Sequence, residues 1–164
     1  VAELKKDIES EITAQKEREA TDKLKDSLVK QLVEKSKVAV PSVLREDQIR
    51  SIEQDMTQNL MYRGMTPEQY FETNGFKDRD EWLEKEAGPA AEDRVKAGLV
   101  LAELSKVEKI QASSDELAER INSFRTQYAN NPDMAKRFDE PEVQREIANS
   151  LLTEKTVQAL IDFN

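Results

Sequence analysis

The side chains that most enzymes use for covalent and metal chemistry are missing from this sequence. It contains no histidine and no cysteine, which excludes thiol nucleophiles, disulfides, Cys/His zinc sites, a Ser-His-Asp triad and the Glu-His pairs of di-metal bundles. Two close carboxylate pairs remain, Asp78/Asp80 and Glu84/Glu86, but neither has the spacing of an EF-hand calcium loop. We interpret Asp78 as a helix cap and the others as solvated helix faces. The sequence therefore predicts no catalytic residue, no metal site and no cofactor.

Methionine and aromatic side chains offer a different chemistry, which is adaptable apolar contact with other polypeptides. The hydrophobic effect is non-directional, so an apolar surface can hold many sequences, and the unbranched thioether of methionine adapts to irregular partners. The densest group of this kind lies at residues 56–65, where Met61, Tyr62 and Met65 fall outside the apolar stripe that runs from Ile49 to Leu60. We expect the stripe to pack in a core, and the off-stripe side chains are the candidates for exposed contact with other polypeptides. Core or loop packing is the alternative for this group, because apolar side chains at helical spacing usually lie inside a protein.

The remaining aromatic residues allow two interpretations. Apolar side chains at helical spacing usually pack inside a protein, so the aromatic residues at 70–71 and at 124–138 are candidates both for core packing and for polypeptide contact. The candidate polypeptide-binding residues, taken together, are Met56, Leu60, Met61, Tyr62, Met65, Tyr70, Phe71, Phe124, Tyr128, Met134 and Phe138.

Charge restricts both the shape and the partners of the chain. Charged residues make up 36% of it, against about 25% in typical proteins, which favours long helices with narrow apolar stripes. The net charge is -9, and all of the acidic excess lies in residues 38–164. An acidic field repels phosphate, so we expect no direct nucleic-acid binding. No stretch approaches the roughly 20 apolar residues of a membrane span, so we expect no membrane association.

Helical periodicity runs through nearly the whole chain and no stretch predicts a strand. The sequence begins without Met inside a helical pattern, and we expect it to be a piece of a longer protein. The expected helices span about 3–37 with a polar middle at 13–23, then 41–63, 66–74, 78–87, 90–107, 113–128, 132–138 and 141–163.

Several residues mark the ends and joints of these helices. Thr66 and Ser113 each precede a glutamine or glutamate by three residues, which is the pattern of a capping box. Gly64 is expected to end the second helix. The Gly88-Pro89 pair predicts either a kink or a turn. Gly98 is expected to allow two helices to approach closely.

Three stretches, in order, resemble the C-terminal domain of trigger factor, a bacterial ribosome-associated chaperone. They are residues 28–44, where a long helix runs into a Val-Pro junction, residues 94–104, and residues 148–160. The resemblance implies an elongated all-α fold with a helical body and two protruding helical arms. On this view the body comprises 1–20 and 149–164, the first arm 21–94 and the second arm 95–148.

The same resemblance implies a function in protein folding. Trigger-factor-like arms form a cradle that holds unfolded or nascent polypeptides without ATP, in the bacterial cytoplasm. The family's ribosome-docking signature and its prolyl-isomerase domain are absent from this sequence. We therefore expect ribosome contact only through a missing domain, and no isomerase activity here. A homodimer is a further expectation, because exposed apolar faces favour self-association.

The composition bears on two other classes of function besides the chaperone. Long charged helices suit a helical scaffold with one dedicated protein partner equally well, and that alternative stays open. A hydrolytic or metal enzyme is disfavoured by the lack of histidine and cysteine.

Overall fold

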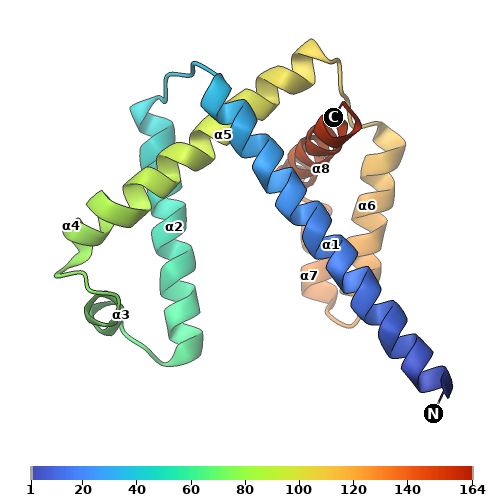
Figure 1. Cartoon of the computed structure of the whole chain (residues 1–164), viewed down its shortest axis with the longest axis horizontal. Helices are drawn as coiled ribbons and strands as arrows, with labels where there is room; N and C mark the ends of the chain where they lie inside the picture. The colour runs from blue at the N-terminus through green and yellow to red at the C-terminus, as the bar shows by residue number, and fades with distance from the viewer. Residues whose placement is uncertain (1, 164) are drawn as a thin grey trace. The chain divides into compact units, whose positions relative to one another are not determined.

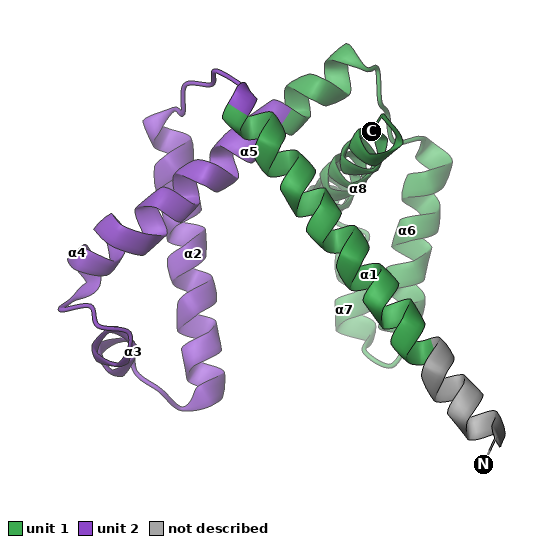
Figure 2. Cartoon of the chain, viewed as in Figure 1, with its two compact units in different colours: residues 1–34, 101–164 green, residues 35–100 purple. Residues whose placement is uncertain are grey.

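The computed structural model describes residues 2–163, and it describes side chains from residue 11 onward. The described residues are almost entirely helical and contain no strand (Figure 1), which confirms the predicted all-α class. The chain divides into two compact units, residues 1–34 with 101–164 and residues 35–100 (Figure 2). The division into a body and two arms that the sequence suggested stays a prediction.

The first unit contains most of α1 (Ala2–Lys35), the end of α5 (Gly88–Val107), α6 (Ser114–Gln127), α7 (Pro132–Arg137) and α8 (Pro141–Asp162). Helices α6 and α8 pack against each other and bury Ile121 on α6 and Leu151 on α8. The polar middle of α1 behaves as its sequence predicts, because every residue from 11 to 24 is exposed. Local hydrogen bonds form along the helix there; for example, the Thr21 hydroxyl donates to the Glu17 carbonyl at 2.8 Å.

The second unit contains α2 (Ser42–Arg63), α3 (Pro67–Thr73), α4 (Arg79–Trp82), a π-helical turn at Leu83–Ala87 and the first part of α5. Its core is a cluster of Phe71, Trp82 and Ala87, against which half-buried apolar residues of α2 and α3 pack. The rings of Phe71 and Trp82 lie 5.9 Å apart. Both α3 and the π-helical turn contact α2, so α2 is the element on which this unit is assembled.

Local signals in the sequence explain where these helices begin and end. The predicted capping boxes are both confirmed: Thr66 accepts from the Gln69 N–H (3.3 Å), and Ser113 accepts from the Glu116 N–H (3.2 Å). Gly64 ends α2 in the left-handed conformation, at φ 64°, which costs glycine little because it lacks a Cβ. Pro41 precedes α2 as its N-cap rather than serving as its first helical residue.

The Gly88-Pro89 pair does not form a turn between two separate helices. The chain stays helical, and the π-helical turn just before the pair lets the Gly88 N–H bond to the Leu83 carbonyl, five residues back. Proline has no N–H and would crowd the carbonyl four residues earlier in a regular helix, so we attribute the wider turn to Pro89. Gly88 is required here, because a Cβ would lie 2.6 Å from the Leu83 oxygen and 2.7 Å from Arg45 Nη2.

The expectation for Gly98 was wrong. This residue is exposed, and a Cβ built on it would meet no atom within 4 Å. Gly98 therefore does not serve a close approach between helices. The sequence pattern cannot show on which side of a helix its neighbours lie, and this is why the expectation failed.

Candidate functional site

The last turn of α2 has one face in the core and another face in solvent. Leu60 is 3% exposed, whereas Met61 is 75% exposed and Tyr62 is 93% exposed. Met65, just beyond the helix, is half-buried and its N–H bonds to the Leu60 carbonyl at 3.0 Å. The exposure of Met61 and Tyr62 agrees with their predicted position off the apolar stripe. Two large apolar side chains on one exposed turn form a ready contact surface.

A shallow hollow of about 350 Å³ opens on this exposed face of α2. It is lined by Gln58, Met61 and Tyr62, which are three and four residues apart and so share one face of the helix. The lining offers a thioether, an aromatic ring, a phenol hydroxyl and a side-chain amide. The six residues 57–62 contain no charged side chain, in a chain that is 36% charged. The hollow therefore suits apolar contact with added hydrogen bonds and requires no ion pairing.

The other candidates in the second unit lie in its core. Phe71 is buried against Trp82, and Met56 and Tyr70 pack on the same cluster, half-buried. The Tyr70 hydroxyl donates to Glu86 Oε1 at 3.4 Å. Burial, and next the negative charge of Glu86, raises the pKa of Tyr70. With the buried Leu60, these residues occupy packing positions that support the exposed face.

The candidates in the first unit form an aromatic group at the α6–α7–α8 connections. The rings of Phe124 and Phe138 stack with centroids 5.5 Å apart and an interplanar angle of 13°. Tyr128 lies 5.8 Å from Phe138 and is 37% exposed, and Met134 is half-buried. An ion pair between Arg125 and Asp139 closes the same segment. The structure thus brings these candidates together as a packed group with one partly exposed rim.

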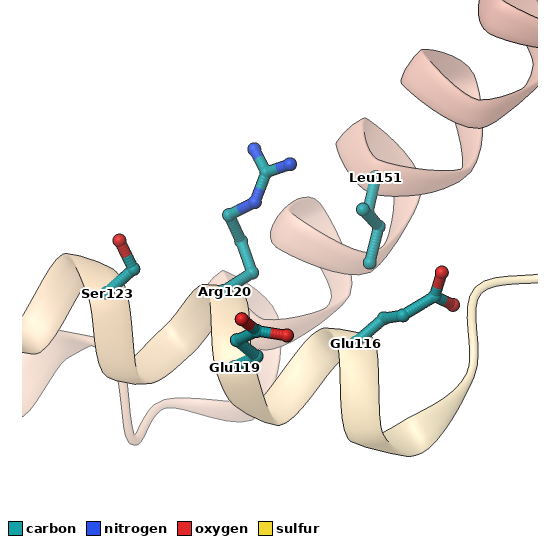
Figure 3. A pocket seen from close by; sticks show the side chains of 5 residues that line it. All are labelled: Glu116, Glu119, Arg120, Ser123 and Leu151. Atoms are coloured by element: carbon teal, nitrogen blue, oxygen red, sulfur yellow. The ribbon is translucent and has the colours of Figure 1, made fainter.

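A second hollow, of about 330 Å³, was not predicted from the sequence. It lies on α6, and Figure 3 shows its polar side chains along that helix with one apolar residue of α8 facing them. It forms because α6 pairs with α8, and no local pattern in the sequence reports that pairing. The only available signal was the four-residue spacing of Glu116 and Arg120 on one helix face. Its lining residues are Glu116, Glu119, Arg120, Ser123 and Leu151.

Ion pairs beside this hollow tie α6 to α8. Lys155 Nζ lies 2.6 Å from Glu116 Oε1, and Arg120 Nη2 lies 2.8 Å from Glu154 Oε2. Glu116 also accepts from the Ser113 N–H at 2.7 Å as part of the capping box. The hydrogen bond from Lys155, followed by those of Ser113, lowers the pKa of Glu116 from 4.5 to about 2.

Neither a cluster of possible metal ligands nor a helix suited to a membrane is present in the described part of the chain. No group of three or more acidic side chains there is placed to hold a metal ion. No helix among the described residues has the length and apolar character needed to cross a membrane.

The sequence of the chain is similar to those of known proteins of one family. Residues 1–162 match the family described as the bacterial trigger factor protein C-terminus. Trigger factor from Halothermothrix orenii is 29% identical over 163 residues, a match that covers 99% of this chain and 38% of that protein. Trigger factor from Clostridium tetani is 33% identical over 127 residues, covering 77% of this chain and 29% of that protein. No solved structure matches the chain significantly.

A further relative has the same pattern of coverage. Trigger factor from Caldanaerobacter subterraneus subsp. tengcongensis is 33% identical over 135 residues, covering 82% of this chain and 31% of that protein. The chain thus spans less than two fifths of the length of these relatives. Because the family model matches almost the whole chain, as the resemblance of its three helical stretches implied, the chain belongs to the bacterial trigger factor family, of which it represents the C-terminal part.

Proposed function

We propose that this chain is a chaperone module that binds unfolded or nascent polypeptides through exposed apolar side chains, without ATP. The observation that carries the proposal is the exposed turn of α2, where Met61 and Tyr62 border an uncharged hollow. Methionine and tyrosine together provide adaptable apolar contact and a hydrogen-bonding hydroxyl. This combination accepts many sequences and imposes no fixed one.

The expected strength of such binding fits a chaperone that releases its substrate unaided. Burying one methionine side chain contributes roughly 1.5–3 kcal/mol. Two or three such contacts contribute roughly 3–9 kcal/mol in total. The costs of association and of ordering an unfolded chain are subtracted from this, so we expect dissociation constants of about micromolar or weaker. Complexes of this strength dissociate without nucleotide hydrolysis.

The remaining parts of the proposal concern the contact residues, the location and the partners of the module. We propose that Met61, Tyr62 and Met65 make the first contacts. In the first unit, the rim of the aromatic group (Phe124, Tyr128, Met134 and Phe138) is a second contact region. Residues Met56, Leu60, Tyr70 and Phe71 contribute by supporting the exposed turn or after local opening. The module acts in the cytoplasm, meets the ribosome only through parts of the full protein outside this chain, catalyses no reaction of its own and can form a homodimer.

An aggregation assay tests the proposed contact surface. A chemically denatured enzyme is diluted into buffer with or without the chain, in the absence of nucleotide, and light scattering is followed. We expect the chain to suppress aggregation and the double variant Met61→Ser/Tyr62→Ser to lose most of the suppression. The matched control is Val43→Ser/Val107→Ser, because those side chains are 64% and 65% exposed but lie in the first turn of α2 and at the end of α5, outside the lining of the hollow. Equal losses in both variants would contradict a specific surface at the last turn of α2.

A pull-down from bacterial lysate separates the chaperone from a scaffold with one dedicated partner. The chaperone proposal requires many substoichiometric polypeptides whose capture depends on Met61 and Tyr62. One stoichiometric partner, retained by the Met61→Ser/Tyr62→Ser variant, would favour the scaffold.

A further inference from the structure

Asn74 and Gly75 form the only Asn-Gly pair in the sequence. In such a pair the backbone nitrogen of the glycine can attack the side-chain carbonyl carbon of the asparagine. The nitrogen loses its proton to a solvent base, the Cγ–Nδ2 bond breaks, ammonia leaves and a succinimide forms. Water then opens the ring at either carbonyl, which leaves aspartate or isoaspartate. Glycine favours the attack because it has no Cβ to crowd the nitrogen.

The structure places this pair at an exposed helix end. Asn74 is the C-cap of α3, and Gly75 follows in the left-handed conformation at φ 79°. Both reacting groups are held by hydrogen bonds: Asn74 Nδ2 donates to the Tyr70 carbonyl at 2.8 Å, and the Gly75 N–H donates to the Glu72 carbonyl at 3.2 Å. The reaction therefore requires the last turn of α3 to open.

The opening of α3 is expected to be easier than that of the helices that hold other asparagines. Helix α3 has seven residues, and short helices depend on their caps and on tertiary packing. Asn122-Ser123 and Asn149-Ser150 instead lie inside α6 and α8, of 14 and 22 residues. Exposed backbone bonds at the end of a short helix belong to the least protected part of a protein.

We propose that Asn74 is a site of spontaneous conversion to aspartate and isoaspartate, at a rate set by local opening of α3. The product loses the bond from Nδ2 to the Tyr70 carbonyl and gains a negative charge. Isoaspartate also adds a methylene to the backbone between Phe71 and Phe76, where the Phe76 N–H donates to the Phe71 carbonyl at 2.8 Å and closes this turn. Conversion thus loosens the attachment of Phe71 in the core of the second unit.

Peptide mapping of the aged chain tests the proposal. Trypsin releases residues 64–77 between Arg63 and Lys77, and Asn74 is the only asparagine in that peptide. The chain is incubated at mildly alkaline pH, and conversion is followed by mass spectrometry and by an isoaspartyl methyltransferase assay. We expect conversion at Asn74 to precede conversion at Asn122 and Asn149, and to be faster in urea than in the folded chain.

Two matched cap variants separate local opening from global unfolding. Thr66→Ala removes the capping box of α3, and we expect about fivefold faster conversion at Asn74. Ser113→Ala removes the equivalent box of α6 in the other unit and should leave the rate at Asn74 unchanged. The proposal is overturned if Asn74 converts no earlier than Asn122 and Asn149, if Thr66→Ala has no effect, or if Ser113→Ala accelerates conversion equally. If a variant folds poorly, the rates of conversion at Asn74 in the folded and in the urea-unfolded parent chain still test the proposal. Equal rates in these two states would also overturn it.

Discussion

Two glycines in the same helix have opposite surroundings. Gly88 is buried at the start of α5, where the Leu83 carbonyl and the Arg45 guanidinium leave no room for a Cβ. Gly98 lies ten positions further along α5, where a Cβ would meet nothing within 4 Å. The same residue type is thus a steric requirement at one position and only an entropic cost at the other.

A pair of alanine substitutions follows from this difference. Gly88→Ala is expected to lower the free energy of unfolding by about 1–3 kcal/mol, because overpacking forces the backbone or Arg45 to move. Gly98→Ala is expected to raise it by about 0.5–1 kcal/mol, because alanine restricts the unfolded chain more than glycine does. Urea unfolding followed by circular dichroism measures both. A stable Gly88→Ala variant would show that the π-helical turn can relax around the added methyl.

At the scale of elements, Glu116 links the start of one helix to the docking of another. Its carboxylate accepts from the Ser113 N–H, which closes the cap of α6, and from Lys155 Nζ, which belongs to α8. Losing this one side chain therefore weakens both a helix end and a helix pair. The pairing of α6 with α8 covers Ile121 and Leu151, so the ion pairs flank the apolar contact between these helices.

The lowered pKa of Glu116 predicts a pH dependence of stability. Since the pKa is about 2 in the folded chain and 4.5 ordinarily, the ionised carboxylate stabilises the fold above pH 4.5, and this contribution is lost as the pH falls towards 2. Glu116→Gln should therefore reduce the loss of stability between these pH values. Urea unfolding at a series of pH values measures the effect. The control is Glu119→Gln. The Glu119 carboxylate lines the same hollow, but it forms no salt bridge in the described structure. Equal pH profiles for Glu116→Gln and the parent would contradict the assignment.

At the scale of the whole molecule, the features that could be predicted from the sequence are local ones. The helix starts at Thr66 and Ser113 were predictable because a capping box spans only four residues. The exposure of Met61 and Tyr62 could be expected because helical spacing separates them from the apolar stripe that ends at the buried Leu60. These signals require no knowledge of which elements pack together.

Features that depend on contacts between distant segments could not be predicted. The hollow on α6 requires α8, and the ion pair beside it joins Arg120 to Glu154, 34 positions further along the chain. The π-helical turn reflects how the chain accommodates Pro89 while Trp82 and Ala87 face one core, and the sequence showed only that the helix was disturbed. The role expected for Gly98 was wrong for the same reason, because periodicity does not identify the neighbours of a helix.

The division of the chain into two units predicts that the second unit folds alone. Residues 35–100 are continuous in sequence and contain the cluster of Phe71, Trp82 and Ala87, whereas the first unit is assembled from two separate segments. A domain this short is only marginally stable, so the fragment should be helical but unfold at lower urea than the full chain. Trp82 is the only tryptophan, and it is 2% exposed. Its emission should therefore lie at short wavelength in the folded fragment and shift to longer wavelength on unfolding. A fragment with solvent-exposed tryptophan emission and no helical circular dichroism would show that this core forms only when the first unit is present.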